Sequence, residues 1–489
     1  MSETDPDGDP ETETTDGPDS ADDSSAMIRP KWREDLLLIA KIVLATYVGF
    51  FVVGILSGAG INSTVGTLQS ITFWAALFAL GALALNLHWG YTGMFNIGVA
   101  GFMAIGAYTM SIAIASPDGS PAGFGLPIPV GIILGMIAAG IAGLVLVIPT
   151  LRVRADYFAI VTLGFSEIVR LSVQSRSLRR IGDTEYGTGG GQGIRATPVD
   201  SVIPWLFDQP VIGDVGNVFL EIGAAIGIAS SVLMRGMYTG VLILFVIAFY
   251  ILLTRIAYSP FGRVLKAIRD DELAAKSLGK RTDRAKIVAF AVGCALMGLV
   301  GTLWMGSRTH ISPDSFMPLI TFYVFVALIV GGSGSNTGSV IGGFAFAAFI
   351  FEGPRFVRTI VRENLGTDFP RTAYGAFAEL GGGDPTAMIG YVLYQQADEV
   401  RYILLGVVLI VIMIKRPDGL LGHRKEISAG VDLTRRGAVA DGGRPAVGGD
   451  TDAAAADDRQ SNTGDDNDSQ METNDPDTTT AENGGKDHE

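Results

Sequence analysis

The sequence of 489 residues contains one cysteine, Cys294, and four histidines. A single cysteine excludes a disulfide framework and a metal site built on cysteines, and Cys294 is best explained as a small packing residue within an apolar stretch. His88, His310, His423 and His488 show no metal-ligand spacing, and no Ser/His/Asp cluster or carboxylate pair recurs at helical spacing. The sequence therefore predicts no catalytic residues and no metal site, and it argues against an enzyme.

Charged residues are scarce as well, at 18% of the chain, whereas 48% of the side chains are apolar and the mean hydropathy is +0.37. This composition is more apolar than that of an ordinary soluble domain. A helix needs roughly 20 apolar residues to cross a bilayer, and such stretches recur along the middle of the chain. The composition predicts an all-α polytopic membrane protein and excludes a soluble enzyme with one or two anchors.

The two ends of the chain have few bulky apolar residues and few basic ones. Residues 1–26 contain ten Asp and Glu and no Lys or Arg, and residues 427–489 contain fifteen Asp and Glu against five Lys and Arg. Such segments bury too little surface to offset the entropy of ordering them. We predict disordered acidic tails at 1–30 and 427–489 around a membrane domain at 31–426. The carboxylates indicate solvation in concentrated salt, as in a halophile, and interaction tails are the alternative.

About ten apolar segments are expected to cross the membrane. They lie at about 36–56, 67–88, 94–115, 128–148, 157–174, 240–257, 287–306, 316–333, 338–352 and 402–415. Residues 217–233 are also apolar, but Glu221 and the glycines in that stretch favour a re-entrant or surface helix as much as an eleventh span.

Basic residues predict the orientation, because short loops rich in Lys and Arg remain in the cytoplasm. They precede the first span, separate the fourth from the fifth, follow the last, and are densest at 255–286, where nine Lys and Arg face four Asp and Glu. Ten spans place all four regions and both termini in the cytoplasm. Five arginines in loop 175–239 run against this rule, which long loops obey only weakly.

Small residues recur every four positions in two stretches. Gly131, Gly135, Ala139 and Gly143 form one row, and Gly334, Gly338 and Gly342 form another. Such spacing lets helix backbones approach closely, so we predict close helix packing along both rows.

A polar interruption follows the second span. Thr92 and Asn96 stand beside Gly93 and Gly98 in an otherwise apolar run. Unwound backbone at membrane depth is tolerated only where protein or a water-filled cavity satisfies its polar groups. We predict a broken helix that forms a wall of a transport path, and a tight loop around 90–93 accounts for the pattern equally well.

A charged pair interrupts the fifth span. Glu167 lies ten residues after Tyr157, or about 15 Å deep if the helix begins there, and an unpaired charge at that depth is costly. Arg170, three residues later, is placed to pair with it. The pair is either a polar element of the path or an ion pair that pins two helices, and the second interpretation is slightly favoured.

The basic segment 255–286 differs from the other loops. Pro260 and Gly262 end a span, and apolar residues then alternate with charges in a helical pattern over 263–278. A short amphipathic helix of this kind lies on lipid or fits a groove in a partner protein. Composition alone slightly favours the lipid surface.

Six sequence strings resemble those of a known family. "GYTGMFNIGVAGFMAIGAYT", "LRVRADYFAIVTLGFSEIVRLSV", "GTGGGQGI", "SPFGRVLKAIRDDELAAKSLG", "LIVGGSGSNTGSVIGG" and "KRPDGLLG" occur in the order found in LivM-type permease subunits of branched-chain amino-acid ABC transporters. The resemblance covers most of residues 67–422. Two stretches depart from the family's usual strings. Val99 stands in place of a histidine within 96–102, and 188–194, which includes Gln192, keeps the glycine framework but changes the side-chain polarity.

The resemblance implies an ATP-driven importer in the cell membrane. Its partners would be an extracellular substrate-binding protein, a second permease subunit, cytoplasmic ABC ATPase subunits and the lipid bilayer, with no cofactor and no nucleic acid. The printed sequence has no GxxxxGK[ST] string, so ATP hydrolysis is expected on separate polypeptides. Urea or short-amide uptake is the nearest alternative and sugar uptake a more distant one. An ion-coupled secondary transporter, of a different class, would not need the segment 255–286.

Two sets of site residues follow. The expected substrate path comprises Thr92, Gly93, Asn96, Gly98, Asp156, Tyr157 and Glu167. The residues expected to couple the permease to the ATPase are Arg263, Arg269, Glu272, Ala274, Ala275 and Gly279, by their similarity to the family's coupling motif.

Overall fold

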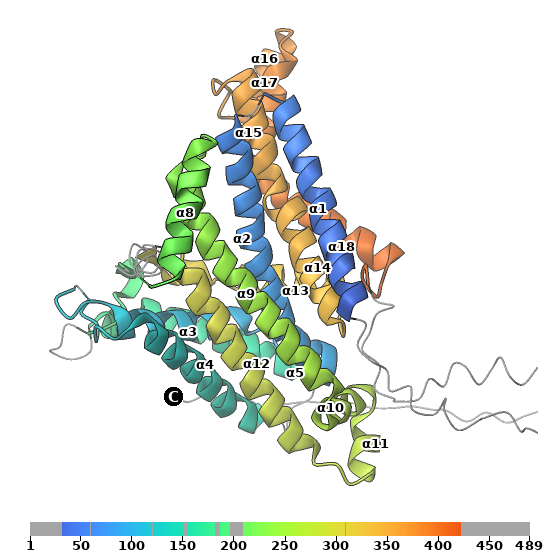
Figure 1. Ribbon diagram of the computed structural model, residues 1–489. Coiled ribbons are helices and arrows are strands. Elements are labelled where there is room, and N and C mark those ends of the chain that lie inside the picture. The colour runs from blue at the N-terminus through green and yellow to red at the C-terminus, as the bar shows by residue number, and fades with distance from the viewer. Residues whose placement is uncertain are drawn as a thin grey trace, which may run out of the picture. The chain divides into compact units, whose positions relative to one another are not determined.

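The computed structural model describes residues 32–58, 60–119, 121–150, 155–180, 186–195, 209–308 and 310–421. The predicted acidic tails lie outside these residues. Within them the chain is largely helical (Figure 1). The strands described are one antiparallel pair of two residues each, β1 (Ile194–Arg195) and β2 (His310–Ile311). The all-α prediction is therefore confirmed.

Seven helical segments of the described chain are long and apolar enough to cross a membrane. They comprise α1 (Trp32–Leu56), α2 (Ile61–Leu85) with the π-helix η1 (Asn86–Gly90), α4 (Ile128–Thr150), α9 (Ser230–Tyr258), α12 (Thr282–Met305), η3 (Pro313–Phe316) with α13 (Pro318–Gly331), and α14 (Asn336–Ala345) with η4 (Phe346–Phe351) and α15 (Gly353–Leu365). The prediction of a polytopic helical membrane protein holds.

The remaining three predicted spans are also helices. They are α3 (Val99–Ile114), α5 (Ala155–Gln174) and α18 (Ala397–Lys415). α3 has only 16 residues, and α5 and α18 carry charged side chains, so none of the three meets the same criteria of length and hydropathy. Ten crossings remain a prediction, although each expected segment coincides with a helix.

Shorter elements complete the described chain. α8 (Ile212–Ala225) has 14 residues, which is too short for a span, so the surface or re-entrant alternative describes this stretch better than an eleventh crossing. The others are α6 (Arg176–Arg179), η2 (Gly190–Gln192), α10 (Pro260–Asp270), α11 (Glu272–Ser277), α16 (Ala373–Gly381), α17 (Pro385–Gly390) and η5 (Tyr391–Gln395).

Hydrogen bonds identify which helix ends share a side. Asn336 Nδ2 donates to Thr254 Oγ1 (3.2 Å), which joins the start of α14 to the end of α9. The backbone amide of Leu420, after α18, donates to Val330 O near the end of α13 (2.9 Å). These ends lie toward α10 and α11, whereas α16 and α17 lie at the opposite ends of the helices (Figure 1). There, Asn364 Nδ2 of α15 donates to Ser57 O after α1 (2.8 Å).

The small-residue row on α4 lies against α3 and α12. A Cβ atom at Gly135 would lie 2.5 Å from Gly106 O, and one at Gly143 would lie 2.6 Å from the Cβ of Cys294. These contacts leave no room for a side chain. The predictions of close helix packing and of a packing role for the buried Cys294 are confirmed for this row.

Candidate functional site

The predicted interruption after the second span is present. α2 continues through η1, the chain leaves helical geometry from Gly93 to Gly98, and α3 begins at Val99. Gly93 has φ +72°, which a residue with a Cβ adopts at a cost, so glycine suits this turn. We call η1 together with the chain up to Gly98, residues 86–98, the first break below.

The polar side chains of the first break are buried and satisfied within the chain. Asn96 has no exposed surface, and its Nδ2 lies 3.1 Å from His88 Nδ1. Asn96 Oδ1 accepts from the amide of Gly98 (2.9 Å). His88 Nε2 lies 3.1 Å from Phe290 O in α12, and these partners assign the imidazole proton to Nε2. Asn96 and His88 therefore hold the first break in one conformation.

The first break packs against the buried face of α5. The amide of Ile97 donates to Thr162 Oγ1 (3.0 Å), and a Cβ atom at Gly98 would lie only 2.7 Å from Thr162 O. The structure thus brings Gly98 and α5 together, as expected for the two parts of the predicted path. Thr92 and Asn96, however, face the interior of the chain and border neither of the two cavities described below.

The opposite face of α5 is uncovered. Tyr157, Ile160 and Ile168 are 58%, 65% and 65% exposed. Glu167 accepts two hydrogen bonds from the Arg170 guanidinium, at 2.9 and 2.5 Å, and Arg170 Nη1 lies 3.6 Å from Asp314 in η3. The ion pair therefore also ties α5 to the segment before α13. The side chain of Asp156 lies outside the described part of the chain.

A second break separates α13 from α14 and lies beside the first. Asn86 Oδ1 accepts from the amide of Gly334 (2.8 Å), and Asn86 Nδ2 donates to Asn336 Oδ1 (3.2 Å). Tyr91 Oη also donates to Asn336 Oδ1 (2.8 Å). Gly334 has φ +86° in this break, so the expectation that it continues a helical row was wrong. A Cβ atom at Gly338, in contrast, would lie only 2.7 Å from Gly331 O, so Gly338 does pack closely.

The basic segment forms two helices where a single helix over 263–278 was predicted. α10 ends at Asp270, Asp271 is extended with φ −157°, and α11 begins at Glu272. Asp271 accepts a hydrogen bond from the amide of Ala274 (3.0 Å) through its side chain. A short acidic side chain that caps the next helix competes with continued helix, which explains the division.

α10 is anchored to the first break. Arg269 Nη1 donates to Gly90 O (2.7 Å), and a Cβ atom at Gly93 would lie 3.5 Å from Arg269 Cγ. Lys266 is completely buried, with Nζ 5.6 Å from the centre of the Tyr91 ring and 5.5 Å from that of Tyr258. We call Asn86, Tyr91, Lys266, Arg269 and Asn336 the junction, because they join α10 to both breaks.

The most exposed apolar residues of the basic segment lie in α11 and at its C-cap, Leu278. Leu273 and Leu278 are 75% and 77% exposed. Glu272 pairs with Lys286 in α12 and lies 3.2 Å from Lys276. Partial burial raises the pKa of Glu272 and the hydrogen bonds from the two lysines lower it, and the balance holds that pKa below its ordinary value.

The six expected coupling residues have different environments. Arg263, Ala274 and Gly279 are exposed, whereas Ala275 is buried. Arg269 and Glu272 bind partners in their own chain and are only partly accessible. The sequence did not predict a role for Asn86, Lys266 and Asn336. Each is a polar residue within or close to one of the glycine-containing motifs, which could have marked it in the sequence. The partners that give these residues a role, however, lie up to 250 residues away in the chain.

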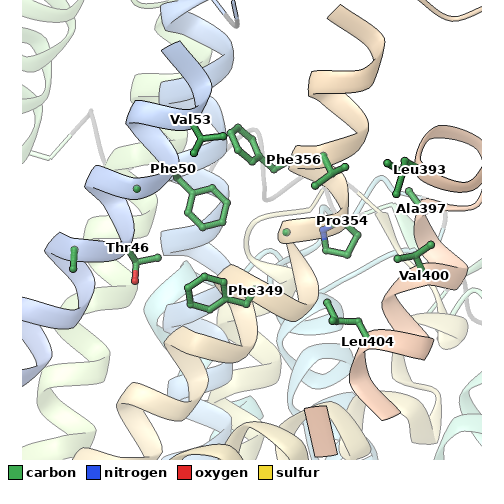
Figure 2. Close-up of a pocket in the computed structure, with 14 residues that line it drawn as sticks. Thr46, Phe50, Val53, Phe349, Pro354, Phe356, Leu393, Ala397, Val400 and Leu404 are labelled. Carbon is green, nitrogen blue, oxygen red and sulfur yellow. The ribbon is translucent and has the colours of Figure 1, made fainter. Parts of the chain in front are cut away.

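Two apolar cavities flank α1. One has a volume of about 650 Å³ and lies between α1, η4 with α15, and η5 with α18. Figure 2 shows Phe50 of α1 and Phe349, Pro354 and Phe356 of the opposite helices around it. Thr46 is the one hydroxyl residue of its lining, and its Oγ1 already donates to Ile42 O (2.9 Å). This cavity has nothing that would bind the charged groups of an amino acid.

The other cavity has a volume of about 810 Å³ and lies between α1, α2, α9 and α14. Within the described residues, no group of three or more His, Cys, Asp and Glu side chains is placed to hold a metal ion. The site of interest is therefore the pair of breaks with α5 and the junction.

The comparisons with known proteins concern the same region. Residues 67–354 match the family model described as "Branched-chain amino acid transport system / permease component". The match begins in α2 and ends in α15, so it includes both breaks, α5 and the basic segment.

Three curated relatives are similar over much of the chain. The high-affinity branched-chain amino acid transport system permease protein LivM of Escherichia coli (strain K12) is 30% identical over 390 residues, which is 80% of this chain and 75% of that protein. Its counterpart in Salmonella typhimurium (strain LT2) is 29% identical over the same shares. The probable LivM of Methanocaldococcus jannaschii is 26% identical over 57% of this chain and 79% of its own length. No solved structure matches the chain.

Proposed function

The chain belongs to the family of permease components of branched-chain amino acid transport systems, and we propose that it is a LivM-type subunit of an ATP-driven importer for these amino acids. The family consists of membrane permeases and not of enzymes. The observation that carries the proposal is the 30% identity to a LivM protein over 80% of the chain. The family match at 67–354 includes both breaks and the basic segment.

Partner subunits follow from the same proposal. A substrate-binding protein outside the cell would deliver the amino acid, a second permease would complete the path, and ABC ATPases would bind in the cytoplasm. α11 is the surface we assign to the ATPase, because Leu273 and Leu278 are exposed and apolar. Clusters of such residues beside a polar rim are typical of protein interfaces.

The junction would transmit a movement of this docking surface to the membrane domain. A displacement of α10 would act directly on the carbonyl of Gly90 through Arg269, and on Tyr91 and Asn336 through Lys266. Both breaks would then respond together, since Asn86 hydrogen-bonds both to Gly334 and to Asn336. Non-helical segments accommodate such changes in backbone angles more readily than intact helices do.

We assign the substrate path to the first break and α5. Tyr157 and Glu167 lie on parts of α5 that the chain leaves accessible, and a second permease could cover this face. Thr92, Gly93, Asn96 and Gly98 would form the supporting wall, with Asp156 at the start of the helix. A zwitterionic substrate needs polar groups of this kind to replace its water.

The test is uptake of radiolabelled leucine by cells that express the chain with its ATPases, second permease and binding protein. We expect uptake that unlabelled isoleucine and valine inhibit and that a Walker-lysine substitution in the ATPase abolishes. Competition by urea or short amides in place of valine would assign the alternative substrate class. Uptake that survives the ATPase substitution but stops with an ionophore would identify a secondary transporter and refute the proposal.

A further inference from the structure

The larger cavity ends at Arg255, for which the described residues provide no polar partner. Its lining comes from one face of α1, from α2, from seven residues of α9 and from α14, and it is apolar except for a few hydroxyl groups and Arg255. Arg255 lies in the last turn of α9 and is exposed. Within the described chain it makes neither a hydrogen bond nor an ion pair. We call this cavity the α1–α9 groove.

The length of the α1–α9 groove matches one leaflet of a bilayer. Its lining runs from Leu36 to Tyr47 on α1 and from Ile243 to Arg255 on α9. These stretches are about 16 and 18 Å long by helical rise, and half of a typical hydrocarbon core is about 15 Å thick. The end away from Arg255 is closed by the hydrogen bond between Tyr47 Oη and Thr72 Oγ1 (2.5 Å).

We propose that the α1–α9 groove binds an anionic phospholipid of the cytoplasmic leaflet, with its acyl chain along α1 and α9 and its phosphate on Arg255. The apolar lining suits an acyl chain, and a guanidinium binds a phosphate through two parallel hydrogen bonds. Basic groups between helices at the cytoplasmic surface recognise such headgroups. The placement of Arg255 on the cytoplasmic side rests on the proposed function, through its orientation of the segment 255–286.

One acidic group lies near the mouth of the groove. The Asp35 carboxylate accepts a hydrogen bond from the Tyr250 hydroxyl (3.4 Å), and Tyr250 lines the groove. The negative charge of Asp35 repels a phosphate, so the attraction between Arg255 and the phosphate must exceed this repulsion. This makes the charge of Arg255 the decisive variable for a test.

The experiment measures lipid retention by the purified full-length protein with native mass spectrometry, after exchange into mixed phosphatidylglycerol and phosphatidylcholine of equal chain length. We expect one phosphatidylglycerol to be retained preferentially. Arg255→Gln should reduce this retention about tenfold, which corresponds to about 1.4 kcal/mol, because the phosphate loses its charged hydrogen-bond donor. Arg235→Gln, an exposed arginine at the other end of α9, is the matched control and should retain the lipid.

A second pair of variants tests the acyl chain. Ile247 lines the groove, whereas Leu244 is an exposed residue of α9 outside it, so Ile247→Trp should lower retention and Leu244→Trp should not. Equal retention of both lipids, or unchanged retention by Arg255→Gln, would refute the proposal. The proposal would also be refuted if the second permease occupied the groove in place of the lipid. An Ile247→Cys variant that crosslinks to the second permease would show this. The readout needs neither substrate nor ATPase, so a failure of the transport proposal would leave the lipid result standing.

Discussion

Gly98 and Arg269 both make contacts between segments that are distant in the sequence. Gly98 allows the first break to approach the backbone of α5, and Arg269 joins α10 to the end of η1. The sequence predicted a role for both residues, Gly98 in the substrate path and Arg269 in an ATPase contact. The structure adds a contact within the chain to each, so their substitution has consequences that do not depend on a substrate or a partner.

Substituting Gly98 tests the contact between the first break and α5. In Gly98→Ala the new Cβ would lie 2.7 Å from Thr162 O, and the backbones must separate, at a cost of about 1–3 kcal/mol. We expect a lower midpoint of thermal unfolding in detergent. Gly164→Ala on the uncovered face of α5 meets no atom within 4 Å and should leave the midpoint equal or higher. An unchanged midpoint for Gly98→Ala would show that the backbones are free to adjust.

Substituting Arg269 tests the link from α10 to the breaks. Arg269→Gln removes the guanidinium that donates to Gly90 O, so we expect the amount of leucine transported per ATP hydrolysed in proteoliposomes to fall about tenfold. Arg284→Gln, an exposed residue in the first turn of α12, is the control. A normal ratio for Arg269→Gln would assign the link to Lys266 and Tyr91 instead.

Helix positions were predicted well, because hydropathy is a local property of the chain. All ten expected segments coincide with helices, although seven meet the criteria for a span. Helix continuity was predicted less well. α9 begins ten residues before the expected start at 240, and the helix expected over 263–278 is divided at Asp271. Capping competes with helix propagation by small energies that an apolar pattern does not reveal.

The salt bridges of Glu272 give α11 a pH dependence. The pKa of Glu272 is lowered in the folded protein, so its contribution to stability is present above the ordinary pKa of a glutamate and is lost as the pH falls through the lowered value. We expect α11 to detach from α12 only in acid, seen as faster hydrogen exchange at 272–277. Glu272→Gln should show the fast exchange at neutral pH, and equal exchange in both proteins would contradict the assignment.

At the level of the whole chain, the topology is the feature most open to test. The end of α9, the start of α14 and the turn after α18 lie toward α10 and α11, so the basic residues at 255–286 and at 415–416 lie on the same side of the described helices. A cysteine at Ser277 in intact cells should resist an impermeant thiol reagent and react after permeabilisation. Val218→Cys, on the exposed surface of α8, should react without permeabilisation. The reverse pattern would invert the proposed orientation.

The sequence by itself determined the membrane class, the helix positions, the close packing of α4 and, through six ordered motifs, the family. These depend on composition and on spacing within one segment, which any window of the sequence contains. Only the tertiary structure decided that the two breaks touch, that Lys266 and Arg269 of α10 bind to them, and that Arg255 has an apolar groove beside it. Each of these contacts joins helices far apart in the chain, and the partner of a buried polar group is set by how helices pack and not by its neighbours in sequence.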